Sequence, residues 1–217
     1  MDRQFRIARH WSNIQLKKYA PIFKGDVVNI SANKDYDKEG TYYRQYFTNA
    51  RSYSITNYGG TNGESDNIDE IHLDLENPLA SNLYRRFDIC FNHTTLEHTY
   101  HVQIAFSNIC NMAKNVVILV IPWAQQVHTC DSFKDWWRMS PYTVEKMFEE
   151  NGFTMVVCNW NNDFNAAVYL FCIGIRNESL QDYPEFEKIH LESCVSVPGK
   201  WIGKKRICSF IKRIISK

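Results

Sequence analysis

The sequence predicts an α/β fold in which one mostly parallel sheet, with an antiparallel last strand, is covered by helices on both faces. Residues 87–92 and 115–121 form short, almost continuously apolar runs, as expected of strands that are buried on both faces. Helical stretches separate such runs along the chain. Residues 153–160 and 166–176 are joined by a loop too short for a parallel crossover, so this final pair is expected to be antiparallel.

The other elements follow the same logic in chain order. Ile7, Trp11 and Ile14 recur at i, i+4 and i+7, which predicts a helix over 3–20 with these side chains buried. Ser140 and Pro141 are typical of a helix start, and a helix from there would end near Gly152. We expect further strands at 26–30, 53–57 and 70–75, a helix beginning over 41–47, and another helix over 101–113.

Length and composition indicate one globular domain with extensions. The chain has 217 residues and a formal net charge of +1, a balance that does not favour a nucleic-acid binder. We divide it into an N-terminal helix (1–24), a main domain (25–178), a connecting segment (179–199) and a basic tail (200–217). The seven scattered cysteines form no Cys-x-x-Cys pair, and no apolar run approaches the roughly 20 residues of a membrane span. A cytoplasmic protein is expected.

The tail from 200 to 217 combines basic residues with an apolar stripe. Ile207, Phe210, Ile211, Ile214 and Ile215 follow helical spacing, and the tail contains no acid. Such a helix suits peripheral contact with an anionic membrane, at the inner face in a cytoplasmic protein. The alternative is a terminal helix that packs its stripe on the domain.

Several motifs together resemble a known family, the class I S-adenosylmethionine-dependent methyltransferases, in a bacterial branch. The similarity covers roughly 24–175. Residues 87–98 resemble the fourth-strand motif with its Leu-Glu-His helix start, and 116–122 resemble the fifth-strand motif that ends in proline. Residues 135–153, with His128 ahead of them, resemble the following helix. The resemblance implies a Rossmann-like, seven-stranded sheet and S-adenosylmethionine as cofactor.

The resemblance also implies the cofactor-binding positions. These are Asn29, Ser31, Asn33 and Asp35 in the first-strand loop, Asn57 after the second strand, Asp74 and Leu75 after the third, and Asn92 and His93 after the fourth. Ser31, Asn33 and Asp35 stand where glycine or small residues are usual, and Asn57 stands where an acid usually accepts hydrogen bonds from the ribose. The first-strand glycine loop is therefore degenerate.

Candidate residues for chemistry follow the fourth and fifth strands. Transfer to oxygen or nitrogen often needs a base, and we expect His128 or His98 to be catalytic. Trp123, Trp137 and Arg138 are candidates for the acceptor site. His98 could instead cap or solvate a helix start, and Trp137 and Arg138 could instead pack the helix against the sheet. No metal is expected, since His93 and His98 are five apart and do not share a helix face, and the cysteines match no zinc spacing.

Two functions remain open. The first is a methyltransferase acting on a sugar or polysaccharide precursor or on a small metabolite, and the second is an inactive methyltransferase-like scaffold. If the side chains of 31–35 and of Asn57 lie clear of the adenosyl pocket, the enzyme is favoured. If they fill the pocket, the scaffold is favoured. RNA modification rests on the basic tail alone, so nucleic acid is an unlikely partner.

Overall fold

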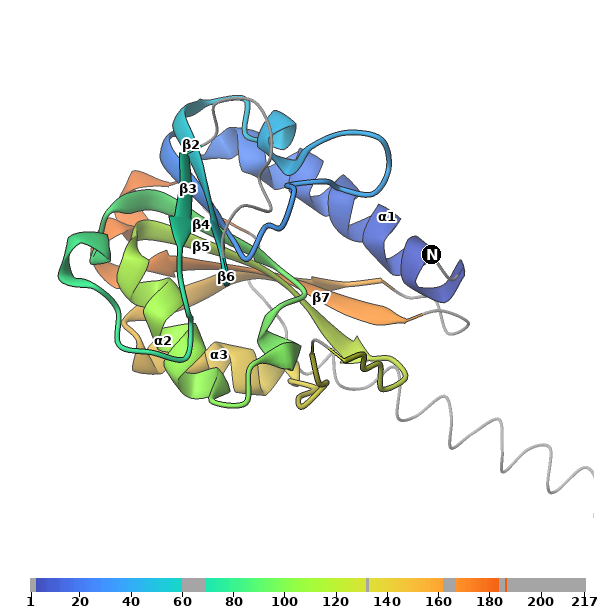
Figure 1. Cartoon of the computed structure of the whole chain (residues 1–217). Coiled ribbons are helices and arrows are strands. Elements are labelled where there is room, and N and C mark those ends of the chain that lie inside the picture. The colour runs from blue at the N-terminus through green and yellow to red at the C-terminus, as the bar shows by residue number, and fades with distance from the viewer. Residues whose placement is uncertain (1–2, 60–68, 132, 162–166, 184–185, 187–217) are drawn as a thin grey trace, which may run out of the picture.

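The computed structural model describes residues 3–59, 69–131, 133–161, 167–183 and 186, with side chains from residue 6 onward. Seven strands form one sheet (Figure 1) in the order β3-β2-β1-β4-β5-β7-β6. They are β1 (Gly25–Ile30), β2 (Ala50–Asn57), β3 (Asp69–His72), β4 (Phe87–His93), β5 (Ala113–Ala124), β6 (Phe153–Trp160) and β7 (Val168–Arg176). The first five strands run parallel, and β7 lies antiparallel between β5 and β6. The predicted fold class is confirmed.

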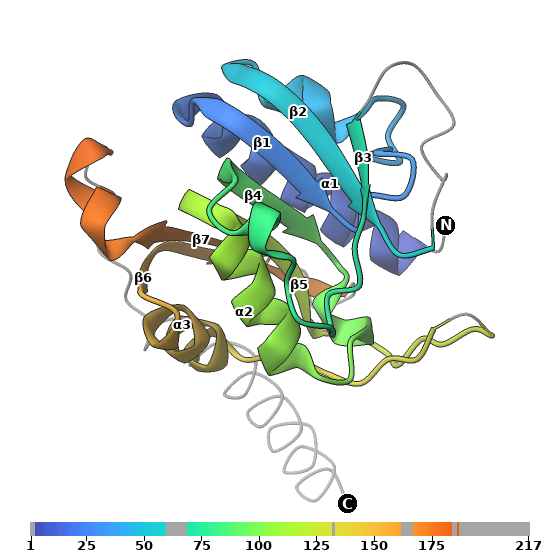
Figure 2. The same cartoon turned by 60° about the vertical axis from the view of Figure 1, so that its left-hand side comes forward.

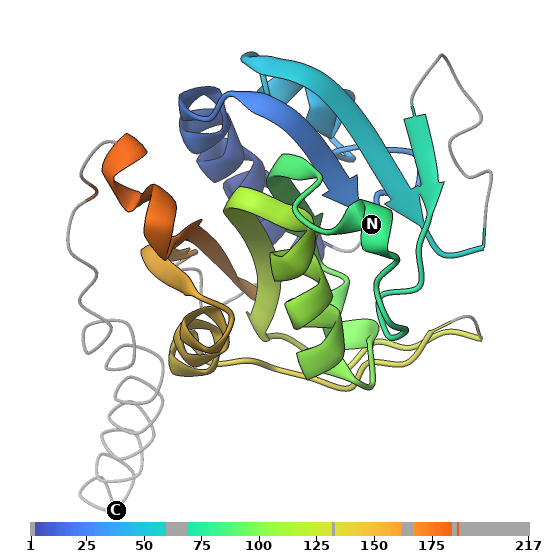
Figure 3. The same ribbon diagram turned by 90° about the vertical axis from the view of Figure 1, so that its left-hand side faces the viewer.

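Helices cover both faces of the sheet. On one face lies α1 (Arg3–Tyr19), and on the other lie α2 (Val102–Met112) and α3 (Pro141–Glu150), as Figures 2 and 3 show. Alternate residues of each central strand enter opposite cores: Val27 and Ile89 join the α1 side, while Val28 and Cys90 join the α2 and α3 side. Short 3-10 turns lie at Ala20–Ile22, Tyr43–Tyr46, Ser81–Leu83, Leu96–His98 and Asn177–Asp182.

Three local predictions differ from the structure. The helix expected to begin over 41–47 is only a 3-10 turn, and the third strand ends at His72 instead of residue 75. In α1 the predicted buried face is only partly right: Trp11 packs on the core, but Ile14 is 51% exposed, and the fully buried positions include Ala8, Ser12 and Leu16. The buried positions also follow helical spacing, but they include a serine because its hydroxyl bonds inside the fold, which hydropathy does not indicate.

Arg176 joins the end of α2 to the sheet. Its Nη2 donates to the carbonyls of Cys110 and Ala113, and its Nε donates to the carbonyl of Lys114, each at 2.8 Å. Carbonyls at a helix end have no partner within the helix, so a buried guanidinium is a suitable donor there. This contact holds α2 against the start of β5.

The parallel strands place their carboxyl ends along one edge of the sheet. Loops after β1, β2, β3, β4 and β5 therefore meet there, which is where open α/β sheets bind ligands. Among the residues that the structure describes, no helix is both long and apolar enough to cross a membrane. The predicted tail (200–217) and most of the connecting segment (179–199) lie outside the described residues.

Candidate functional site

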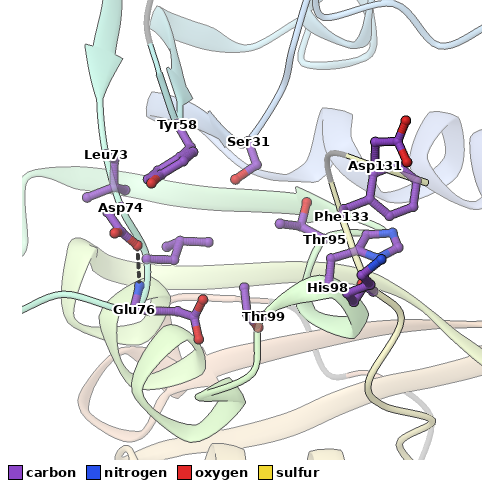
Figure 4. A pocket seen from close by; sticks show the side chains of 12 residues that line it. Ser31, Tyr58, Leu73, Asp74, Glu76, Thr95, His98, Thr99, Asp131 and Phe133 are labelled. Atoms are coloured by element: carbon purple, nitrogen blue, oxygen red, sulfur yellow. Dashed lines mark hydrogen bonds between the residues drawn. The ribbon is translucent and has the colours of Figure 1, made fainter. Parts of the chain in front are cut away.

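A cavity of about 500 Å³ opens at the carboxyl edge of the sheet (Figure 4), and we call it the edge cavity. Its lining comes from the loops after all five parallel strands: Ser31, Tyr58, Leu73, Asp74, Leu75, Glu76, Thr95, His98, Thr99, Asp131, Phe133 and Lys134. Its size falls in the range usual for small-molecule sites. The mixture of an exposed aromatic ring, apolar side chains and acids suits a ligand with both a flat ring and hydroxyl groups.

The loop after β1 keeps a glycine-like backbone without glycine. Ser31, Asn33 and Asp35 have φ values of 56°, 53° and 60°, in the left-handed region that side chains rarely adopt. The Asp35 carboxylate is buried, where it accepts hydrogen bonds from Asn29 Nδ2 at 2.8 Å and from the Tyr53 hydroxyl at 2.7 Å. Burial raises the pKa of Asp35, and these two hydrogen bonds oppose the rise. Asp35 therefore holds the strained turn in place and does not line the edge cavity.

Asn57 also serves the β1 loop. Its Oδ1 accepts from the Asn33 N–H at 2.7 Å, and its Nδ2 donates to the Asn33 carbonyl at 3.1 Å and to Glu70 Oε1 at 2.7 Å. Asn57 is 4% exposed and does not line the edge cavity. The amide thus clamps the loop that lacks glycine, and a charged acid at this position could not donate both bonds.

The remaining predicted cofactor residues divide into lining and supporting ones. Asp74 and Leu75 both line the edge cavity, and the Asp74 carboxylate also accepts from the Glu76 N–H at 2.9 Å. Asn92 is fully buried and donates to the Ile30 carbonyl at 2.9 Å, which ties the end of β4 to β1. Asn92 therefore supports the edge of the sheet from beneath.

A second, cationic cavity of about 280 Å³ adjoins the first, since Ser31 and Thr95 line both. Arg9, Lys34 and Lys38 bring three positive side chains to its wall. Among the described residues, no acid lies within 4 Å of any of these three cations as an ion-pair partner. Burial, with Arg9 nearby, lowers the pKa of Lys38. Such a cavity favours an anionic group.

His93 lines the cationic cavity. Its Nε2 is 3.0 Å from the Ser12 hydroxyl, and its Nδ1 is 3.4 Å from Arg9 Nη1. Burial and the Arg9 charge lower the pKa of His93 well below its ordinary value, so the ring is neutral at pH 7. Arg9 also donates to the Tyr43 hydroxyl at 2.8 Å, which fixes its guanidinium over the end of β4.

The two predicted catalytic histidines lie together. The rings of His98 and His128 are 4.9 Å apart between centroids, and Phe133 packs on both. His98 Nδ1 donates to the Lys134 carbonyl at 2.8 Å, and His128 Nδ1 lies 3.0 Å from Asp135 Oδ2. His98 lines the edge cavity (Figure 4). The structure thus brings both histidines to one end of this cavity.

The three predicted acceptor residues lie apart from one another. Trp123 packs edge-on against Trp160, with 6.3 Å between ring centroids. Trp137 Nε1 donates to the Thr99 carbonyl at 2.9 Å, and Arg138 forms a two-pronged pair with Asp135. None of the three lines the edge cavity. These contacts are structural: Trp123 packs β5 against β6, while Trp137 and Arg138 hold the loop after β5 in place.

Sequence reasoning did not single out Arg9, Tyr58 or Glu97 as site residues. Tyr58 directly follows β2 and Glu97 lies within the quoted Leu-Glu-His motif, so their positions in sequence could have indicated them. Arg9 reaches the site from α1 and lies 84 residues before His93 of β4 in sequence. No local signal in the sequence marks that contact.

No family model matches the chain, and no curated protein does either. Solved structures do match. The first is 1,6-didemethyltoxoflavin-N1-methyltransferase of Burkholderia thailandensis, bound to S-adenosylhomocysteine, with 9% identity, 78% of each chain covered and a TM-score of 0.59. The YcgJ protein of Bacillus subtilis is 12% identical, and the match covers 77% of this chain and 98% of YcgJ with a TM-score of 0.57.

Magnesium protoporphyrin IX methyltransferase from Synechocystis, with bound S-adenosylmethionine, has 9% identity, 80% and 82% coverage, and a TM-score of 0.53. At such identities the likeness concerns the fold. Strand order, the parallel first five strands and the antiparallel β7 agree with it. The chain has the fold of the class I S-adenosylmethionine-dependent methyltransferases.

Proposed function

We propose that this protein is an S-adenosylmethionine-dependent methyltransferase that binds its cofactor in the edge cavity. One observation carries the proposal: the two side chains that could have blocked this cavity, Asp35 and Asn57, turn into the protein and leave the cavity open. An inactive scaffold would be favoured by a filled cavity. Ser31, the only one of the three glycine-replacing residues on its wall, is small.

The lining suits the parts of the cofactor. Tyr58 offers an exposed ring at the end of β2 on which a flat base can stack. Asp74 and Glu76 offer carboxylate oxygens for ribose hydroxyls or an adenine amine. The cationic cavity, reached past Ser31, suits a carboxylate, and Arg9 is held there ready to donate.

S-adenosylmethionine supplies an electrophilic methyl group on a positively charged sulfur. The chain must then hold the acceptor in line and remove its proton. His98 can do the latter: its Nδ1–H is fixed on the Lys134 carbonyl, so Nε2 carries the lone pair. Burial lowers the pKa of His98, which keeps the ring neutral and able to accept a proton at pH 7.

We further propose a small acceptor, either a metabolite or a sugar or polysaccharide precursor. The edge cavity is of a size for small molecules, and the fold's solved relatives include enzymes named for small-molecule substrates. Cytoplasmic location, and membrane contact through the basic tail (200–217), belong to the same proposal. They rest on the cysteine pattern and on the apolar stripe of the tail.

Calorimetry with S-adenosylmethionine and S-adenosylhomocysteine tests the proposal. We expect micromolar binding of both, and binding about tenfold weaker in Tyr58→Ala, since stacking on an aromatic ring contributes roughly 1–1.5 kcal/mol. Tyr84→Ala removes another exposed tyrosine, before β4 and outside the lining of the edge cavity, and should bind as the wild type does. Absence of binding at millimolar ligand would refute the proposed methyltransferase and favour the inactive scaffold.

A further inference from the structure

Three side chains capable of binding a metal meet at the end of the edge cavity. One ligand atom of each of Glu97, His98 and His128 lies within 4.8 Å of the other two. Glu97 and His98 belong to the turn after β4, and His128 comes from the loop after β5. The histidine pair that sequence spacing argued against, His93 and His98, is not the one that the fold brings together.

One oxygen of the buried Glu97 side chain has no partner in the fold. It is 1% exposed, and its Oε2 is buried with no hydrogen-bond partner. Its Oε1 lies 3.7 Å from His98 Nε2, too far for a hydrogen bond. A buried carboxylate oxygen without a partner is costly, and a bound cation is one of the few ways to satisfy it.

Both histidines are oriented from outside the cluster. His98 Nδ1 donates to the Lys134 carbonyl, which leaves Nε2 on the side of Glu97. His128 Nδ1 lies 3.0 Å from Asp135, which is itself held by Arg138. Asp135 Oδ2 also accepts from the His128 backbone N–H at 2.8 Å, and Gln125 Nε2 lies 3.1 Å from His128 Nδ1. A carboxylate beside the ring is the kind of outer partner that metal-binding histidines usually have.

We propose that Glu97, His98 and His128 bind a divalent first-row transition metal, such as Mn²⁺ or Zn²⁺, at the end of the edge cavity. Two imidazoles and one carboxylate suit these ions better than Mg²⁺ or Ca²⁺, which take oxygen ligands. Three protein ligands leave further coordination positions of the metal open. Because His98 lines the edge cavity, a molecule in that cavity could reach those positions. If the proposed methyltransferase function holds, on which this step rests, the open position would take a hydroxyl oxygen of the acceptor. With the metal bound, His98 Nε2 would be a ligand and not the base, and the ion would instead lower the pKa of that hydroxyl. The substrate class is then a hydroxyl-bearing molecule, such as a sugar.

Metal binding is tested on the full chain after dialysis against EDTA, without cofactor. We expect one equivalent of Mn²⁺ to bind by calorimetry, with loss of the free-ion signal in electron paramagnetic resonance. Glu97→Gln and His128→Gln should each bind at least tenfold more weakly, since losing a ligand costs no less than losing an outer partner. His101→Gln, at an exposed histidine beside the cluster in sequence, should bind as the wild type does.

Two results would overturn the metal site: no stoichiometric binding of Mn²⁺ or Zn²⁺ to the wild type, or equal binding by all four proteins. Circular dichroism of each variant establishes that a loss of binding does not reflect unfolding. S-adenosylhomocysteine binding, measured separately in EDTA, distinguishes the two proposals. Cofactor binding without metal binding would support the proposed methyltransferase and contradict the metal site. Metal binding without cofactor binding would support the metal site and contradict the proposed methyltransferase.

Discussion

Replacing Glu97 with glutamine should make the metal-free protein more stable at neutral pH. The Glu97 carboxyl is 1% exposed, and burial raises its pKa from an ordinary 4.5 to about 8. In the folded protein the group therefore keeps a proton that the unfolded chain loses above pH 4.5. A folded-state pKa raised in this way leaves stability intact below pH 4.5 and lowers it as the pH rises toward 8. Glutamine carries no proton to lose, so the variant avoids this penalty.

The size of the effect follows from the two pKa values. With 1.36 kcal/mol per unit, the wild type loses about 1 kcal/mol at pH 5 and about 3 kcal/mol at pH 7 relative to the fully protonated state. The difference in unfolding free energy between variant and wild type should therefore grow by about 2 kcal/mol over this interval. Any constant cost of burying an amide cancels in that comparison.

Urea denaturation at pH 5 and pH 7, in EDTA, measures this difference. At typical slopes for a domain of this kind, the midpoint of the variant should move up relative to wild type by roughly 1–2 M between the two pH values. Glu178→Gln, at an exposed glutamate, controls for the loss of one formal charge. A variant-to-wild-type difference that stays constant or shrinks from pH 5 to pH 7 would refute the reasoning. With excess Mn²⁺ the order should reverse, because only the wild type keeps the full ligand set.

Two further substitutions test the supports of the site and of the fold. Asn57→Asp, which introduces the acid usual in the family, should lower the unfolding free energy by about 2 kcal/mol and weaken S-adenosylhomocysteine binding. The reason is that it removes two donated hydrogen bonds and places a second carboxylate next to Glu70. Equal or tighter binding in calorimetry would contradict the proposed role of Asn57 in holding the β1 loop. Arg176→Met should cost about 3 kcal/mol in urea denaturation, because the carbonyls of Cys110 at the end of α2 and of Ala113 and Lys114 at the start of β5 lose their donor. A cost below about 1 kcal/mol would show that water replaces the side chain.

The strands and main helices could be predicted because their signals are local. The apolar runs at 115–121 and 153–160 correspond to β5 and β6, and the helix predicted over 140–150 is α3, whose first turn is capped by Ser140 as expected. The α1 face was predicted only partly correctly, because apolar spacing alone chose Ile14. In the folded protein the face of α1 that packs on the sheet instead carries the small side chain of Ala8 and the polar one of Ser12, which contacts His93.

For the site, sequence position indicated the edge and the structure decided the roles. Asp74, Leu75 and His98 line the edge cavity, as expected for residues that follow strands. Asp35, Asn57 and Asn92 are committed to holding the strand ends together. A residue's place after a strand predicts that it lies near the site, but the direction of its side chain depends on partners from other strands.

The sequence by itself determined the α/β class, the positions of the strands and the edge of the sheet at which the cavity opens. These follow from hydrophobic period, loop length and the parallel direction of strands, all of which act over a few neighbouring residues. The tertiary structure alone decided that Asn57 clamps the β1 loop, that Arg9 reaches the second cavity, and that Glu97 meets two histidines. Those contacts join segments distant in sequence, and only the packing of the whole chain sets which polar groups are buried together.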